Sequence, residues 1–226
     1  MNKTIFAVSL IILIAAFTSL IVPDVANTIS SDIDVIIDAG HGLPDGGAVA
    51  YDGTTEAELN LAIAVMINDL LEQKGIKCVL TRSTSDGIYS EGSSIHSKKI
   101  SDIRNRVKIA KANPKALLVS IHMNTYPSDD VYGAQVFYSK NSDFSKSVAL
   151  EIQNAVNLNF QKENKKNIKQ IPENVYLFNH VPNDCVLIEC GFLTNYNELE
   201  KLKDGSYQRK LASTVSEVLI YKLLGE

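Results

Sequence analysis

Short apolar runs alternate with longer amphipathic stretches along most of this chain, and that alternation limits the folds open to it. The runs predict strands at residues 34–38, 76–81, 116–121, 134–138, 175–178 and 184–189. The amphipathic stretches predict helices at residues 56–74, 100–112, 144–160 and 206–224. Parallel strands need long connections, which are usually helical. We therefore expect a single α/β domain with a mainly parallel, twisted sheet of about six strands flanked by helices.

The N-terminal segment differs from the rest of the chain. Residues 5–22 form an almost unbroken apolar run after Lys3. As a helix this run would span about 27 Å, slightly less than a hydrocarbon core of ~30 Å. We expect residues 1–30 to be a signal peptide or membrane anchor with a linker, and residues 31–226 to form an exported domain. Any membrane contact would then involve only the N-terminal segment.

Charge and cysteine content narrow the function classes. The net charge is −4 and no long basic block is present, which argues against nucleic acid as the main partner. Cys78, Cys185 and Cys190 all lie in or beside apolar runs, which favours buried thiols over a disulfide or a metal site. Cys185 and Cys190 are an odd number of positions apart, so they should face opposite sides of a strand.

Three segments between these elements are predicted to be loops. Residues 83–97 are rich in Ser and Gly, and residues 161–170 are polar and basic. Residues 40–53 are rich in Gly, but they lack the Gly-Lys-Ser/Thr ending of a phosphate-binding loop and the spacing of a dinucleotide site. No Gly-x-Ser-x-Gly motif is present, so a covalent hydrolase scheme has little support.

Four polar residues stand at the ends of the predicted elements. His41, His122 and Glu189 follow or end apolar runs, and Glu56 opens the first predicted helix. The carboxyl ends of parallel strands meet at one edge of a sheet, where α/β proteins bind ligands. We therefore expect these four side chains to converge at that rim. Two imidazoles and one carboxylate are the ligand set of many catalytic zinc sites, and a second carboxylate could move protons.

Each of these residues also has an ordinary structural explanation. A lone histidine is more often packed or exposed than a ligand. A carboxylate at Glu56 or Glu58 would suit the positive end of a helix dipole, and the residue pattern does not choose between the two. Glu189 is harder to explain in this way, because it ends an apolar run and an unpaired buried carboxylate is costly. Asp38 is a candidate to orient the His41 ring. The alternative is that Asp38 is an ordinary turn residue at the end of a strand.

Six ordered blocks of sequence resemble the zinc-dependent N-acetylmuramoyl-L-alanine amidases of the type-3 amidase family. The blocks cover residues 35–42, 56–61, 81–82, 106–113, 120–124 and 187–195. The resemblance implies one zinc ion held by His41, Glu56 and His122, and so it selects Glu56 over Glu58. It implies that Glu189 is catalytic, and that residues 31–226 are an amidase catalytic domain acting on peptidoglycan. Arg82 and Asn124 are expected to contact the substrate.

Two further segments, residues 133–138 and 174–178, point to the spore-cortex branch of this family, which supports muramic-δ-lactam formation. The chain departs from the family pattern at Leu43, at residues 183–185 and at Cys190, and none of these changes removes an expected ligand. The expected function is hydrolysis of the amide between N-acetylmuramic acid and L-alanine, in the cell wall or spore cortex. Long polar loops are compatible with a need for an accessory spore-envelope protein for full activity or zinc loading.

Two alternatives remain at this level. Another zinc peptidoglycan peptidase of the same architecture would share the metal ligands but cut within the stem peptide. A non-catalytic wall-binding module would bind the glycan without cleaving it.

Overall fold

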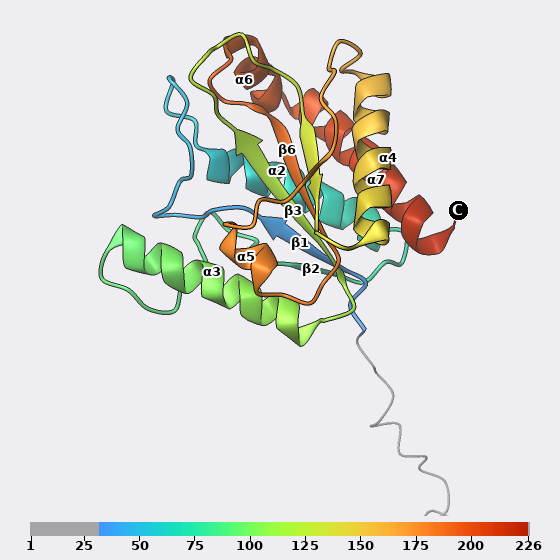
Figure 1. The fold of residues 1–226 in the computed structure, drawn as a ribbon. Helices are drawn as coiled ribbons and strands as arrows, with labels where there is room; N and C mark the ends of the chain where they lie inside the picture. Colours follow the sequence, from blue (N-terminus) through green and yellow to red (C-terminus); the bar gives the residue numbers. More distant parts are fainter. Residues whose placement is uncertain (1–31, 226) are drawn as a thin grey trace, which may run out of the picture. The chain divides into compact units, whose positions relative to one another are not determined.

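The computed structural model describes residues 32–225, which contain a six-stranded sheet with helices on both faces (Figure 1). The expected signal peptide or anchor at residues 1–30 lies outside the described residues and stays a prediction. None of the described helices is long and apolar enough to cross a membrane. The strands are β1 (Val35–Ala39), β2 (Cys78–Leu80), β3 (Leu117–Asn124), β4 (Gln135–Tyr138), β5 (Lys169–Gln170) and β6 (Cys185–Phe192). The helices are α2 (Glu56–Glu72), α3 (Ile95–Ala112), α4 (Asp143–Asn159), α5 (Tyr176–Asn179), α6 (Tyr196–Lys203) and α7 (Gly205–Leu224).

The strand order in the sheet is β2-β1-β3-β6-β4-β5. Strands β2, β1, β3 and β6 are parallel, and β4 pairs with β6 in the antiparallel direction. The expected mainly parallel sheet of about six strands is therefore confirmed. Because the four parallel strands share one direction, their carboxyl ends lie at one edge of the sheet.

The two faces of the sheet carry separate apolar cores. Helices α2, α4, α6 and α7 supply the larger core, which includes Ile37, Ile121 and Ile188 from the strands. Helices α3 and α5 supply the smaller core, which includes Ile36, Leu118 and Leu187. Figure 1 shows α5 in front of the strands with α3 beside it at the lower left, while α2 and α7 lie behind the sheet. Alternate residues of each strand face the two cores, as the pleat requires.

The two cores show on which side of β6 each cysteine lies. Cys190 belongs to the larger core and Cys185 to the smaller one, so the two thiols face opposite sides of β6 as expected. Both thiols are buried, and burial raises the pKa of Cys185 to about 12. Cys78 is half-buried.

Three sequence predictions need correction. Residues 175–178 are not a strand, because Tyr176–Asn179 form the one-turn helix α5, whose Leu177 packs in the smaller core. Helix α6 was not predicted at all. Helix α3 begins at Ile95, not at residue 100, because Ser94 and Ser97 form a reciprocal capping box there.

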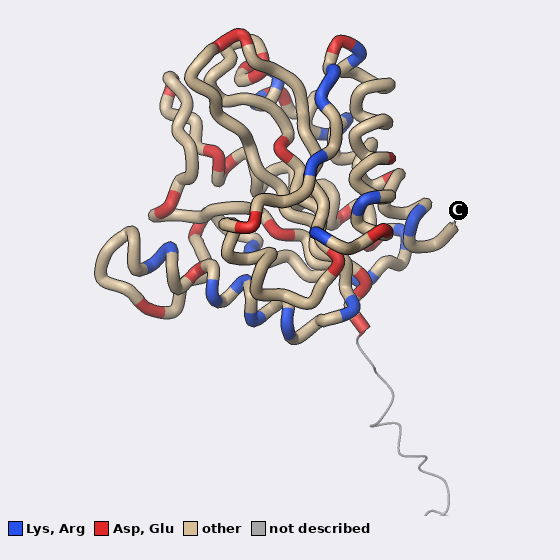
Figure 2. Tube along the Cα trace, in the orientation of Figure 1, with Lys and Arg blue, Asp and Glu red and all other residues tan. Residues whose placement is uncertain are grey.

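Charged residues of both signs are interspersed along the described chain (Figure 2). Basic positions recur along the exposed side of α3 and along the segment that returns from α4 to β5, and acidic positions lie between them. The expectation from net charge that nucleic acid is not the main partner stays a prediction.

Candidate metal centre and active site

Three of the four predicted residues meet at the carboxyl edge of the sheet. His41 follows β1, Glu56 opens α2 and His122 lies in β3, and one ligand atom from each lies within 4.8 Å of the others. The Nε2 atom of His41 is 3.2 Å from Oε2 of Glu56. The Nδ1 atom of His122 is 2.9 Å from Oε1 of the same carboxylate. Residues 81 positions apart are therefore joined through one carboxylate, as the strand-end argument predicted.

Two glycines allow the chain to pack this closely around the side chains of His122 and Glu56. A Cβ on Gly40 would lie 2.3 Å from Nε2 of His122, and a Cβ on Gly47 would lie 2.6 Å from Oε2 of Glu56. Between them His41 has a φ of 59°, in the left-handed region that non-glycine residues rarely adopt. Such strain is typical of functional sites, where the surrounding structure holds it in place.

The Glu56 carboxylate is held by backbone as well as by the two rings. The backbone N–H of Met123 donates to Oε1 over 3.1 Å, and the N–H of Ala48 donates to Oε2 over 3.0 Å. The Thr55 side chain caps α2, so Glu56 lies in the first helical turn and is buried. Glu58 is exposed to solvent. The geometry therefore places Glu56, and not Glu58, between the histidines.

Asp45 is the carboxylate that orients His41. Its Oδ2 accepts from Nδ1 of His41 over 3.0 Å and also pairs with Lys99 at 3.0 Å. Because Nδ1 donates in this bond, Nε2 is the ring nitrogen on the side of Glu56 that could bind a metal ion. The prediction that Asp38 orients His41 is wrong, because Asp38 is buried under the site and bonds to Thr81, Ser120 and Arg106.

The charges around the three residues favour a bound cation. Burial alone would lower the pKa of His41, but hydrogen bonds and charge from Asp45 and Glu56 outweigh it and raise the pKa to about 9. Burial opposes ionisation of Glu56 as well, yet His122 and His41 hold its pKa far below the ordinary range. The carboxylates thus draw positive charge into the site, which a proton or a divalent metal ion could supply.

Glu189 lies next to this group on β6. It is the register partner of His122 across the β3–β6 pair. Its Oε2 is buried and has no hydrogen-bond partner among residues 32–225. Burial raises the pKa of Glu189, and Glu56 adds to this while His122 and His41 oppose it. A carboxylate with a free buried oxygen and a raised pKa suits proton transfer.

Arg82 has a structural position that the sequence did not suggest. Its side chain is buried and donates to the backbone carbonyls of Ala39, Gly40 and Ala57 over 2.7 to 3.0 Å, and a fourth bond goes to Thr84. These bonds tie β1 and the start of α2 together beside the candidate metal ligands. The geometry favours this positioning role over the substrate contact expected for Arg82.

Asn124 ends β3 at the rim and is half-buried. Its side-chain oxygen accepts from the N–H of Thr125 over 2.8 Å, and its carbonyl accepts from Leu193 over 2.9 Å. Contact between Asn124 and substrate stays a prediction.

Arg106 is a site-supporting residue that sequence reasoning passed over. It is buried, forms an ion pair with Asp38, and donates to the carbonyl of His41 over 2.6 Å. It also pairs with Asp102 one turn earlier on α3, at 2.6 Å. The available signal was its place on the apolar side of α3, between Ile103 and Val107, where a cation must have a buried partner.

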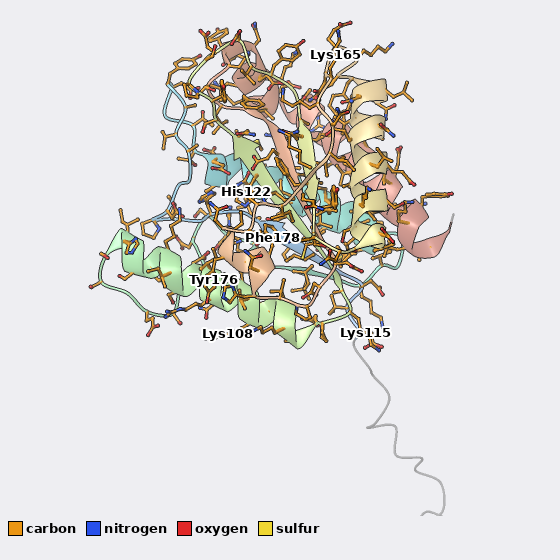
Figure 3. All side chains as sticks on the ribbon, viewed as in Figure 1. Lys108, Lys115, His122, Lys165, Tyr176 and Phe178 are labelled. Carbon is orange, nitrogen blue, oxygen red and sulfur yellow. The ribbon has the colours of Figure 1, made fainter. Side chains whose placement is uncertain are left out.

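A pocket of about 100 Å³ opens beside the two histidines. His41 and His122 line it together with Leu177 and Phe178 of α5. Figure 3 shows His122 on β3 with Phe178 of α5 just below it. The one-turn helix that the sequence did not predict therefore forms a wall of the candidate active site.

Comparison with known proteins agrees with this geometry. The family model for N-acetylmuramoyl-L-alanine amidase matches residues 35–221. The germination-specific N-acetylmuramoyl-L-alanine amidase of Bacillus subtilis strain 168 is 35% identical over 182 residues, covering 80% of this chain and 76% of that protein.

Solved structures give the same result. The CwlD amidase from Clostridioides difficile, in complex with the GerS lipoprotein, superposes with a TM-score of 0.80 and 34% identity, covering 85% of this chain and 99% of that one. An N-acetylmuramoyl-L-alanine amidase from Clostridium difficile 630 gives a TM-score of 0.73 and 28% identity, covering 87% and 100%. The chain therefore belongs to the N-acetylmuramoyl-L-alanine amidase family that its sequence resembles.

Proposed function

We propose that this amidase is zinc-dependent and hydrolyses the amide between the lactyl group of N-acetylmuramic acid and L-alanine of the stem peptide. The observation that carries the proposal is the clustered donor set of His41, Glu56 and His122 beside the partnerless carboxylate oxygen of Glu189. Two imidazole nitrogens and a carboxylate suit one Zn²⁺, with a further position left for water or substrate.

The side chains have distinct tasks in this proposal. A bound Zn²⁺ supplies Lewis acidity, which makes water a stronger acid and polarises a carbonyl. Asp45 keeps the His41 ring in the tautomer that presents Nε2. Glu189 takes a proton from the attacking water and delivers it to the leaving nitrogen of L-alanine. The products are a lactyl carboxylate on the sugar and a stem peptide with a free amino group.

The biological setting that we propose is the spore cortex, where removal of the stem peptide precedes muramic-δ-lactam formation. Similarity to a germination-specific amidase and to CwlD supports it. Export across a membrane is part of the proposal, because peptidoglycan lies outside the cytoplasm. Spores of a strain that lacks this chain should contain no muramic-δ-lactam, and a normal lactam content would refute the cortex assignment.

We further propose an accessory partner that completes the site or loads zinc. The support is that CwlD was solved in complex with the GerS lipoprotein. The test compares zinc content and activity of the purified chain with and without a lipoprotein of that kind from the same organism. Equal zinc content and equal activity in both samples would remove the requirement.

Product analysis tests the function itself. Purified protein with zinc is incubated with muropeptides, and the products are identified by mass spectrometry. The amidase releases an intact stem peptide and leaves a bare lactyl group. Cleavage within the stem peptide would instead indicate a zinc peptidase, and binding without cleavage would indicate a wall-binding module.

The packing around Gly40 gives a prediction for metal binding. Gly40→Ala should weaken zinc binding on the order of 10- to 100-fold, because the new methyl group must push the His122 ring aside. Its backbone does not need glycine, since Gly40 is absent from the positive-φ positions of the described chain. Zinc content after dialysis against a weak chelator measures the effect.

The control is Gly205→Ala, whose nearest neighbour is the end of the Arg209 side chain at 3.5 Å. It should keep its zinc. A Gly40→Ala protein that folds and retains zinc as tightly as the control would place the metal elsewhere.

A further inference from the structure

The row that contains His122 and Glu189 continues onto a third strand. His122 pairs with Glu189 across β3 and β6, and Glu189 pairs with Gln135 across β6 and β4. Directly paired residues point to the same side of a sheet. Their neighbours Ile121, Ile188 and Val136 all face the larger core, so the three polar side chains face the other way. Gln135 is therefore the next side chain after Glu189, on the side away from the metal ligands.

The amide of Gln135 is held in one orientation but only half of it is bonded. Nε2 donates to the carbonyl of Asn167 over 2.8 Å. This bond fixes which end of the amide is the nitrogen, because only a donor can face a carbonyl. Oε1 receives no hydrogen bond from any residue between 32 and 225, and this atom is not among the fully buried ones. The whole residue is nevertheless only 7% exposed.

Gln153 shows what a purely structural glutamine looks like in this protein. It lies on α4, against the opposite face of β4. Its Oε1 accepts from the N–H of Val136 over 3.0 Å, and its Nε2 donates to the carbonyl of Ala134 and to Asn157. Both ends of that amide are used. Gln135 stands between Ala134 and Val136 in the sequence, but its own Oε1 accepts no hydrogen bond within residues 32–225.

The segment that holds Gln135 is itself part of the wall of this region. Residues 161–168 return from α4 and lead into β5, which pairs with β4 at Phe137 and Lys169. Figure 1 shows this segment descending beside β4 on the face that carries α3 and α5. Asn167 thus anchors the Gln135 amide from the side opposite Glu189.

This order of groups matches the order of atoms in the substrate. The scissile carbonyl must lie toward His41, Glu56 and His122, and the leaving nitrogen must lie within reach of Glu189. The next backbone nitrogen of the stem peptide is about 3.6 to 3.8 Å further along the chain. Adjacent strands are about 4.8 Å apart, which is about 1 Å more than this step, so the long side chain that follows Glu189 can reach the second nitrogen.

We propose that Gln135 binds the first peptide bond of the stem peptide, the one that follows L-alanine, by accepting its N–H at Oε1. The inference rests on the proposed amidase function and adds a binding position on the leaving side of the scissile bond. A single amide hydrogen bond that forms on binding is expected to change the specificity constant kcat/KM about tenfold.

Removal of the N–H from the substrate and of the acceptor from the enzyme tests the contact. The substrates are N-acetylmuramoyl-L-alanyl-D-isoglutamine and its ester analogue, in which oxygen replaces the N–H after L-alanine. The full zinc-loaded chain should cleave the amide about tenfold better than the ester, by kcat/KM. Gln135→Met, which keeps the side-chain size, should cleave both at similar rates. Lys169→Ala, on the same wall, should discriminate like the unmodified chain.

Affinity gives a second readout that does not need turnover. The zinc-loaded Glu189→Gln protein should bind the amide compound about tenfold more tightly than the ester by calorimetry, and the added Gln135→Met change should abolish that difference. Equal handling of the two compounds by the unmodified chain would overturn the inference. Gln135→Met that loses activity on both but still prefers the amide would show a structural role, and would also overturn it. Failure of the unmodified chain to cut the lactyl amide in either compound would instead refute the proposed function.

Discussion

Glu189→Gln is expected to lower turnover of muropeptides by on the order of 10³-fold or more while the protein keeps its zinc. The carboxamide has nearly the size and shape of the carboxylate, but it cannot accept a proton from water. Oε2 of Glu189 is buried and has no partner within residues 32–225, so the substitution breaks no hydrogen bond at that atom. Steady-state kinetics and elemental analysis of the same preparation measure both parts of the prediction.

The matched control is Glu200→Gln, which alters an exposed carboxylate on α6 and should keep normal activity. Activity of the Glu189→Gln protein within a few fold of the unmodified chain would remove Glu189 from the chemistry. Loss of zinc together with activity would mean that Glu189 acts as a ligand, since the prediction requires metal content to stay the same.

Arg106→Ala is expected to cost about 3 to 5 kcal/mol of folding free energy, because it leaves the Asp38 carboxylate buried without its charged partner. The same change removes the donor to the carbonyl of His41, which holds the left-handed turn in place. Urea unfolding at pH 7 measures the loss. Arg104→Ala, an exposed arginine on the same helix, should change stability by no more than about 0.5 kcal/mol.

The pH dependence of this loss follows from the Asp38 pKa. Burial alone would raise that pKa, but the charge of Arg106 and the hydrogen bond from Ser120 outweigh it and hold the pKa below its ordinary value. In the unmodified chain this carboxylate stabilises the fold above about pH 4, and its contribution disappears as pH falls through the lowered pKa. Without Arg106 burial dominates, so the variant loses stability as pH rises. The difference between the two proteins should therefore shrink from pH 7 toward pH 3, and a constant difference would contradict this account.

Much of the fold followed from the residues because strand and helix periods were clear. The apolar runs before His41, before His122 and up to Glu189 became β1, β3 and β6, and the helix from Glu56 began where its N-terminal block indicated. The strand expected at residues 175–178 is wrong because four apolar residues fit a strand and a helical turn equally well. The signal for α6 was present, since Asn195 caps the helix by accepting from the N–H of Glu198.

Part of the candidate active site could likewise be predicted from the sequence, and part could not. Convergence of the candidate metal-site residues could be predicted from strand ends, because parallel strands bring distant residues to one rim. The orienting carboxylate could not, because the left-handed turn at His41 directs its ring toward Asp45 and away from Asp38. The direction of β4 could not be predicted from the sequence either. Its antiparallel pairing with β6 places Gln135 beside Glu189.

The most direct test of the central claim follows the oxygen from water into the product. Purified chain is stripped of metal, given one equivalent of zinc, and incubated with muropeptides in ¹⁸O-labelled water before mass spectrometry. We expect the label to enter the lactyl carboxyl of N-acetylmuramic acid, the stem peptide to leave intact and unlabelled, and the stripped protein to be inactive. Label in a carboxyl of the stem peptide, or the same lactyl product from metal-free protein, would contradict this expectation.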